Sequence, residues 1–449
     1  MATTTPSKSC GSPEHSLASA AALAQGAAAG PQTESGVGAW SIPSPRAKPG
    51  FIARRVLKLL SQINLGELKL KCPDGSTMHF GRPDAALGLQ ELWIRDWDVL
   101  RQAGTKGDIG FGEAYMQGAW STPNLPGLLR LLVKNRSAIQ AAISGNPLLL
   151  VLDRLSHMLR ANSLAQAKRN IEAHYDLGND FYQLWLDPTM TYSSALFDQK
   201  GAWGQAVDLQ AAQIRKMDRV LEELGPLRAN SKTLEIGCGW GGLALHRLQT
   251  APGEHVGITL SREQRSWALE RLSAEGLADR AEIALTDYRE VQGQFDGIVS
   301  VEMIEAVGED YWPIYFQTLR DRLKPGGRAV IQAIVIDESL FDDYRSGTDF
   351  IQKYIFPGGM LMSPAHLERH ARAKGLRIRN SFSFGQDYGR TLREWLVRFD
   401  AHREAIRSLR FEERFIAMWR FYLAYCEAGF YSGDLDVLQV TLEHDLAHS

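Results

Sequence analysis

The chain has few cysteines, and their spacing excludes two classes of small, cross-linked protein. Cys10, Cys72, Cys238 and Cys426 are the only four in 449 residues. None forms a CxxC pair, so the spacing supports neither a zinc site nor a disulfide framework. This usage suits a reducing compartment, and we expect a cytoplasmic protein without a metal site.

Long apolar runs and a strong net charge are also missing. No apolar run approaches 18 residues, which argues against a segment that spans a bilayer. The formal net charge is -2, so no global electrostatic pull toward nucleic acid or an anionic membrane is expected. Any contact with the inner face of a membrane must therefore come from a local patch.

The composition divides the chain into three parts. Residues 1–48 are rich in Ala, Ser, Gly and Pro, and we expect a flexible tail, since they cannot bury enough apolar surface to offset the entropy of ordering. Residues 50–145 are expected to form a small α+β domain, and residues 150–449 a larger one. The elements expected in the small domain are a helix at 54–63, a hairpin of 67–71 and 78–81, a strand at 92–95, a helix that opens at Phe111, and a helix at 126–133.

Strands and helices alternate in the larger part. Residues 150–225 are expected to be mostly helical. The strands expected after them are 233–236, 255–259, 281–285, 297–301 and 328–334, with helices at 243–249, 262–275 and 311–323 and a turn at 325–327. Such alternation predicts an α/β, Rossmann-like domain with a mainly parallel, doubly wound sheet. Residues 392–426 follow as a long, amphipathic, aromatic-rich segment.

A glycine-rich turn follows the first of these strands. It reads Leu234-Glu235-Ile236-Gly237-Cys238-Gly239-Trp240-Gly241-Gly242. Glycines allow a tight turn and a close approach of the backbone to a ligand, and the helix that follows offers free N–H groups. A purely structural turn is the alternative. Glu235, Thr259 and Asp287 each lie at the end of a strand, where ligands of doubly wound sheets collect, and this favours nucleotide-type binding.

Several further motifs, in order along the chain, resemble the cyclopropane fatty acid synthase family, which includes the mycolic acid cyclopropane synthases. They are Ala173–Tyr182, Met190-Thr191-Tyr192-Ser193, Glu235–Gly241, Gly257-Ile258-Thr259-Leu260-Ser261 with Gln264, Val301–Gly308 and Asp349–Gly359. The likeness runs from about 170 to 430. Residues 50–145 are similar to the N-terminal domain of the longer members, which looks like a sterol-carrier-type lipid-binding module.

The resemblance implies S-adenosylmethionine as methyl donor and an unsaturated phospholipid acyl chain, at a membrane surface, as substrate. The residues that it assigns to the cofactor are Tyr175, Tyr192 and Ser193 above it, Gly237 and Gly239 beneath its methionine part, Thr259 and Gln264 at the ribose, and Asp287, Tyr288 and Arg289 around the adenine. Two more residues of the turn complete the predicted cofactor site: Glu235, whose position suits an amino group of the ligand, and Gly241. The oligomeric state stays open, with a homodimer as one possibility.

For the chemical step, the resemblance implies a bound bicarbonate as base. Its binders correspond here to Ser194, Glu305, Gln332, Ile334 and Tyr388, with Glu305 as the main catalytic carboxylate. Ser194 stands where cysteine is usual in the family, and Gln332 where histidine is common. Both still form hydrogen bonds, but the loss of a switchable histidine weakens the case for bicarbonate.

Three functions stay open at this point: a cyclopropane synthase, a C-methyltransferase that makes a methylated or branched acyl chain, and a lipid carrier with a silent methyltransferase fold. The intact cofactor residues argue against the third. Plainer interpretations also exist for single residues. Glu305 could be a helix-start carboxylate that the helix dipole favours, and Tyr388 a turn aromatic.

Overall fold

The computed structural model describes residues 48–137, 177–197 and 208–445, which belong to one compact unit. The expected N-terminal tail, except for its last residue, and Tyr175 lie outside these ranges. Within them, no helix is long and apolar enough to cross a membrane, and no group of His, Cys, Asp and Glu is arranged to hold a metal ion.

A small four-stranded sheet forms the N-terminal part, in the order β2-β1-β3-β4. Its elements are α1 (Phe51–Leu60), β1 (Glu67–Lys71), β2 (Thr77–Gly81), β3 (Leu89–Ile94), α2 (Asp98–Met116), β4 (Trp120–Ser121) and α3 (Leu125–Lys134). β1 and β2 pair antiparallel, which confirms the expected hairpin. The expected helix start at Phe111 was wrong, because α2 already begins at Asp98 and continues through a kink at Gly107.

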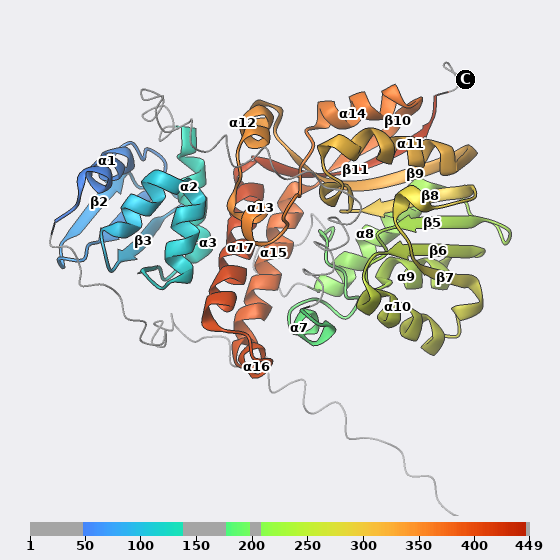
Figure 1. Ribbon diagram of the computed structural model, residues 1–449, viewed down its shortest axis with the longest axis horizontal. Coiled ribbons are helices and arrows are strands. Elements are labelled where there is room, and N and C mark those ends of the chain that lie inside the picture. The colour runs from blue at the N-terminus through green and yellow to red at the C-terminus, as the bar shows by residue number, and fades with distance from the viewer. Residues whose placement is uncertain (1–47, 138–176, 198–207, 446–449) are drawn as a thin grey trace, which may run out of the picture. The chain divides into compact units, whose positions relative to one another are not determined.

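The larger part is built on a seven-stranded sheet in the order β10-β11-β9-β8-β5-β6-β7 (Figure 1). Its strands are β5 (Lys232–Ile236), β6 (Glu254–Thr259), β7 (Ala281–Leu285), β8 (Phe295–Val301), β9 (Leu323–Ile336), β10 (Leu376–Ser383) and β11 (Leu435–His444). The five strands from β9 to β7 are parallel. This confirms the Rossmann-like, mainly parallel α/β fold.

Helices cover both faces of this sheet. Successive residues of a strand point to opposite faces; Ile298 of β8 packs with the residues of one helical layer and Val299 with those of another. The helices are α8 (Leu209–Leu224), α9 (Gly242–Thr250), α10 (Arg262–Ala274), α11 (Trp312–Arg322) and α14 (Pro364–Ala373). The sheet is therefore buried on both sides, and its carboxyl edge is left for the loops that follow the strands.

One expectation for this part was wrong, because the residues expected to form a turn at 325–327 lie inside β9, and two strands, β10 and β11, were not expected. The aromatic-rich segment 392–426 falls in α15 (Gly385–Ala401), α16 (Arg403–Ser408) and α17 (Glu413–Ser432), with Arg410 at a left-handed φ of 69° between the last two. Of the residues 150–225, which were expected to be mostly helical, the described stretch 177–197 holds one short helix, α7 (Asn179–Gln183), and then irregular chain.

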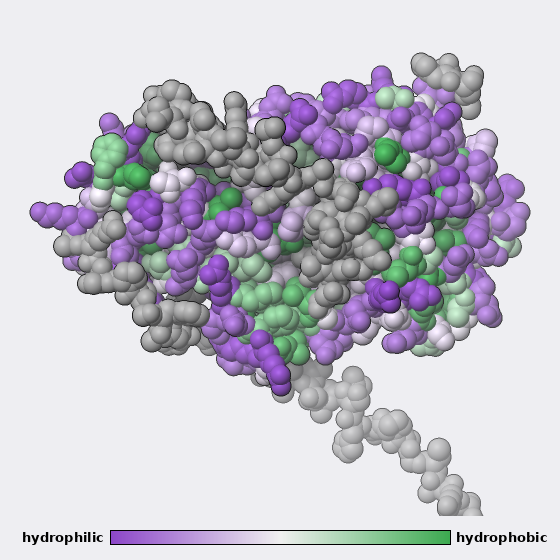
Figure 2. Space-filling view, in the orientation of Figure 1, coloured by the Kyte–Doolittle hydropathy of each residue, from purple (hydrophilic) through white to green (hydrophobic). Residues whose placement is uncertain are grey.

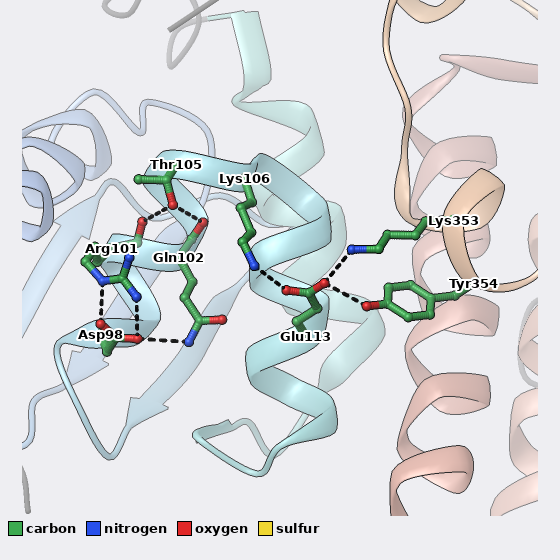
Figure 3. A network of polar contacts seen from close by, with 8 residues as sticks. All are labelled: Asp98, Arg101, Gln102, Thr105, Lys106, Glu113, Lys353 and Tyr354. Carbon is green, nitrogen blue, oxygen red and sulfur yellow. Dashed lines mark hydrogen bonds and ion pairs between the residues drawn. The ribbon is translucent and has the colours of Figure 1, made fainter. Parts of the chain in front are cut away.

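α15 and α17 lie side by side, and α17 also packs against α2 and α3 of the N-terminal part. The visible surface near α16 carries many apolar groups, whereas hydrophilic residues dominate over α11 and α14 (Figure 2). Two short helices, α12 (Phe341–Ser346) and α13 (Phe350–Tyr354), follow β9. α13 contacts α2 through charged groups: Glu113 accepts hydrogen bonds from Lys353 and Tyr354, each at 2.7 Å (Figure 3).

Candidate active site

The glycine-rich turn between β5 and α9 has the backbone that a close ligand needs. Gly237, Gly239 and Gly241 all have left-handed φ values, of 81°, 52° and 76°. A Cβ on Gly237 would meet Met303, and a Cβ on Gly241 would meet Ala268. A Cβ on Gly239 would meet nothing within 4 Å, so the space in front of this backbone is open to a ligand.

Polar side chains at the ends of the next strands form the rest of this cleft. The buried Glu235 carboxylate lies 3.0 Å from His255 Nε2, and burial raises its pKa. Thr259 donates a hydrogen bond to Gln264 Oε1 at 2.8 Å. Asp287 forms a two-point ion pair with Arg289, with both N–O distances 2.8 Å.

These residues line one continuous cleft. The sequence-predicted cofactor residues that line it are Tyr192, Ser193, Glu235, Gly237, Gly239, Thr259, Gln264, Asp287, Tyr288 and Arg289. Gly241 does not line it; it is the N-cap residue of α9 and packs against Ala268. Tyr175 lies outside the described residues.

A second and larger cavity, of about 760 Å³, adjoins the cleft. It is lined mostly by apolar and aromatic side chains, among them Leu60 and Phe111 of the N-terminal part and Phe356 and Phe421 of the larger part. Tyr192, Glu302 and Ala306 line both the cleft and the cavity. These three residues therefore mark the place where a group held in the cleft meets a molecule held in the cavity.

The residues expected to hold an anion lie around this junction. Tyr388, Glu305 and Ile334 line the cavity, while Ser194 and Gln332 are fully buried beside it. The Ile334 N–H donates to Glu305 Oε1 at 2.5 Å, and Glu305 Oε2 has no hydrogen-bond partner. Burial, with the nearby Glu302 carboxylate, raises the pKa of Glu305 to about 8.

Sequence reasoning missed two ionisable groups at this site, the partly buried Glu302 and the buried Lys216. Glu302 follows β8 directly, with a left-handed φ of 49°, and its side chain lies among the residues expected to bind the anion. Lys216 of α8 is buried, lines the cleft, and donates to Ser193 Oγ at 2.7 Å. Glu302 belongs to the motif Val301–Gly308, but nothing in the sequence distinguished its position from that of Glu305. Lys216 belongs to an ordinary helical pattern, which gave no sign of a role at the site.

The comparison with protein families decides the identity. The mycolic acid cyclopropane synthetase family matches residues 162–440. The chain belongs to this family. Tuberculostearic acid methyltransferase UfaA1 of Mycobacterium tuberculosis is 42% identical over 394 residues, which cover 84% of this chain and 87% of that protein. The cyclopropane-fatty-acyl-phospholipid synthase of Escherichia coli is 32% identical over 350 residues, which cover 78% and 87%.

Solved structures agree with the family. The cyclopropane synthase MmaA2 from Mycobacterium tuberculosis has a TM-score of 0.57 and 28% identity, covering 61% of this chain and 97% of that one. Mycolic acid cyclopropane synthase CmaA1, solved with SAH (the demethylated cofactor) and CTAB, gives 0.57 and 29%, with the same coverage. This member of the family is an S-adenosylmethionine-dependent methyltransferase.

The cleft fits that cofactor. Gly239 leaves open space at the turn, and Glu235, Thr259 and Asp287 offer a carboxylate, a hydroxyl and a carboxylate in chain order along it. Bound there, S-adenosylmethionine supplies an electrophilic methyl group. Tyr192 and Ser193, from the irregular chain before α8, also line the cleft, and Tyr192 lines the cavity as well.

Proposed function

We propose that this enzyme transfers a methyl group to the double bond of an unsaturated acyl chain of a membrane phospholipid. The observation that carries the proposal is the junction itself: a cofactor cleft that opens into an apolar cavity of about 760 Å³, within the size of small-molecule sites, about 300–1,000 Å³. A lipid acyl chain suits a cavity with such an apolar lining, because it needs no polar partners.

The surroundings of the junction suit the chemistry of an alkene. An alkene is a poor nucleophile, and its methylation leaves positive charge on carbon. Aromatic faces stabilise a cation, and Tyr192 lies within 5.7 Å, centroid to centroid, of Tyr182, Trp185 and Trp395. The Tyr192 and Tyr422 hydroxyl groups are hydrogen-bonded at 2.7 Å, which fixes both rings at the cavity wall.

Ring closure is the product expected from the family resemblance. A branched product is the second candidate, and two observations favour it. Ser194 and Gln332 replace the cysteine and histidine that the resemblance leads one to expect, and the relative with 42% identity is a tuberculostearic acid methyltransferase. Both products begin with the same methyl transfer, so the residues of the cleft serve either one.

The N-terminal part is proposed to pass the lipid to the site. Leu60 of α1, Leu100 and Phe111 of α2, and Leu129 of α3 line the cavity together with residues of the larger part. An acyl chain that leaves a bilayer would thus meet a continuous apolar wall. We infer a peripheral contact with the membrane surface for this step.

Vesicles test the proposal directly. The enzyme is incubated with S-adenosylmethionine and either a cis-unsaturated or a fully saturated phosphatidylglycerol, and the acyl chains are analysed by mass spectrometry and proton NMR. Methyl incorporation should occur with the unsaturated lipid alone. NMR is needed because a cyclopropane and an exocyclic methylene have the same mass, whereas a saturated branch is heavier by two hydrogens. Equal labelling of the saturated lipid, or none of either, would reject the proposal.

A further inference from the structure

Glu302 occupies an unusual position for a carboxylate. It is a non-glycine residue with a left-handed φ of 49°, at the carboxyl edge of the central strand β8. Residues held in this backbone region cost of order 1–3 kcal/mol and cluster at functional sites. Glu302 also lines both the cofactor cleft and the apolar cavity, so its side chain lies where the methyl group and the acyl chain would meet.

Two donors from separate parts of the chain converge on this side chain. The Ser194 N–H donates to Glu302 Oε1 at 2.8 Å, and Gln332 Nε2 of β9 donates to the same oxygen at 2.7 Å. The Tyr388 hydroxyl of α15 also acts on this carboxyl group and opposes the rise of its pKa. Gln439 of β11 donates to Gln332 Oε1 at 3.0 Å and so holds the Gln332 amide with its NH₂ group toward Glu302.

These donors leave no place for bicarbonate. Of the residues expected to bind it, Ser194 and Gln332 donate to Glu302 and the Ile334 N–H donates to Glu305, while the Tyr388 hydroxyl interacts with the Glu302 carboxyl group. A second anion would also be repelled by the carboxylate already there. The residues present therefore do not fit a bound bicarbonate, because a side chain of the protein fills the anion site.

We propose that the Glu302 carboxylate is the resident base of this enzyme and takes the proton that the methylated acyl chain loses. The inference rests on the proposed function, since it assumes an alkene in the cavity. A carboxylate held by preorganised donors at the place where positive charge develops needs little rearrangement during the reaction.

The step balances without any further reactant. The π electrons of the alkene form the new bond to the methyl carbon, the sulfur–methyl bond breaks, and its electron pair stays on sulfur. The neighbouring lipid carbon is then a cation. Glu302 accepts a proton from the new methyl group. The electron pair of that C–H bond closes a cyclopropane ring or, after a hydride shift, forms an exocyclic double bond.

The surroundings of Glu302 favour its ionised form more than those of Glu305 do. Burial raises the pKa of both carboxyl groups, but Lys216, the hydrogen bonds from Ser194 and Gln332, and the Tyr388 hydroxyl oppose this rise at Glu302. Glu305 has only a backbone N–H beside the charge of Glu302, and its pKa of about 8 leaves it mainly neutral at pH 7. Glu302, which lines both the cleft and the cavity, is thus the better proton acceptor of the two carboxyl groups.

The test compares Glu302→Gly with Glu302→Gln in buffers freed of carbon dioxide, with and without added bicarbonate or formate. Glycine suits the left-handed backbone and empties the anion site, whereas glutamine fills it without a charge. Arg410→Gly, at another left-handed position that is exposed on the loop before α17, is the matched control for the backbone change. Binding of ¹³C-labelled bicarbonate is followed by NMR as a readout independent of turnover.

The wild type should work equally well without bicarbonate and should not bind it. Both Glu302 variants should lose on the order of 10²-fold or more in kcat, the scale of one lost acid–base group, while Arg410→Gly keeps full activity. Bicarbonate or formate should bind to Glu302→Gly and restore part of its activity, and should do neither for Glu302→Gln.

Three results would overturn the assignment: a wild type that needs bicarbonate, full activity in Glu302→Gln, or a folded Glu302→Gly that neither anion restores. If Glu302→Gly does not fold, Glu302→Gln alone decides. A wild type that methylates no lipid at all would instead reject the proposed function, while the bicarbonate-binding measurement would still report whether the chain's own carboxylate fills the anion site.

Discussion

Glu302 and Glu305, three residues apart, have different surroundings at the junction between cleft and cavity. Glu302 has two hydrogen-bond donors and an attractive ammonium group nearby, whereas the second oxygen of Glu305 has no partner. Burial without compensation favours the neutral form of a carboxyl group. Glu305 was expected to carry the negative charge of the site, but its pKa of about 8 leaves it mainly neutral at pH 7.

This difference predicts how stability depends on pH at Glu305. The folded protein holds the Glu305 proton up to about pH 8, whereas the unfolded chain releases it near 4.3. Between these values the folded state binds more protons, so its stability falls as the pH rises. Glu305→Gln does not lose stability in this way. Its free energy of unfolding should therefore rise relative to that of the wild type by up to about 1.4 kcal/mol per pH unit. Chemical denaturation of both proteins from pH 5 to pH 8 measures this difference in stability. A difference that stays constant over the whole range would contradict the raised pKa of Glu305.

Gly239 gives the second prediction at the residue scale. Gly239→Val should abolish most S-adenosylmethionine binding, because the new side chain would extend into the open cleft. Gly276→Val is the matched control. Gly276 also has a left-handed φ, of 68°, with nothing within 4 Å of its Cβ position, but it lies in the exposed turn after α10. Calorimetry should show lost affinity in the first variant and unchanged affinity in the second. Equal affinities would remove the glycine-rich turn from the cofactor site.

At the scale of elements, sequence periodicity predicted the parallel strands and missed the antiparallel pair. β5, β6 and β8 are short apolar runs next to turns, which makes them recognisable. β10 and β11 mix polar and apolar residues, and β11 lies inside the sheet between β9 and β10. Likewise, the positive φ that places Glu302 in the site depends on the loop after β8, and no local pattern shows it.

A buried carboxylate, Glu113, joins α2 and α13. It accepts hydrogen bonds from Lys353, Tyr354 and, at 2.9 Å, Lys106. These hydrogen bonds lower its pKa to about 2 despite its burial. A lowered folded-state pKa gives stability that is present above about pH 4.5 and disappears as the pH falls toward 2.

Glu113→Gln should therefore lower the free energy of unfolding by about 1–3 kcal/mol at pH 7. Its deficit relative to the wild type should shrink steadily below pH 4.5. Glu282→Gln, an exposed site on β7, is the control and should change stability little at any pH. Urea denaturation at several pH values measures both. A deficit that persists unchanged at pH 3 would show that the pairing around Glu113 is not the cause.

At the scale of the whole molecule, the cavity unites parts of the chain that the sequence separates. The helices α1, α2 and α3 supply one wall, and residues after β9 and on α17 supply the other. Most of the residues predicted for the cofactor line the cleft, because they follow strand ends in a fixed order. The sequence could not predict the cavity, since its lining residues come from many separate segments between Val56 and Leu435.

A side chain that fills the cavity should block the lipid and spare the cofactor. Ala103 of α2 lines the cavity, and Ala103→Trp should reduce turnover on vesicles roughly tenfold through steric exclusion of the acyl chain. Ala274→Trp, at the exposed end of α10, is the matched control and should leave turnover unchanged. S-adenosylmethionine affinity should be the same in both. A parallel loss of cofactor affinity in a folded Ala103→Trp would contradict the separation of cleft and cavity.

The most direct test of the account uses S-adenosylmethionine with a fully deuterated methyl group and vesicles of a cis-unsaturated phospholipid. Methyl transfer to the double bond, followed by proton loss from the new methyl to Glu302, predicts a product that carries two deuterium atoms on one added carbon. The label should be absent from saturated chains. Retention of all three deuterium atoms would contradict proton abstraction from the methyl group, and an unlabelled acyl chain would contradict methylation of the alkene itself.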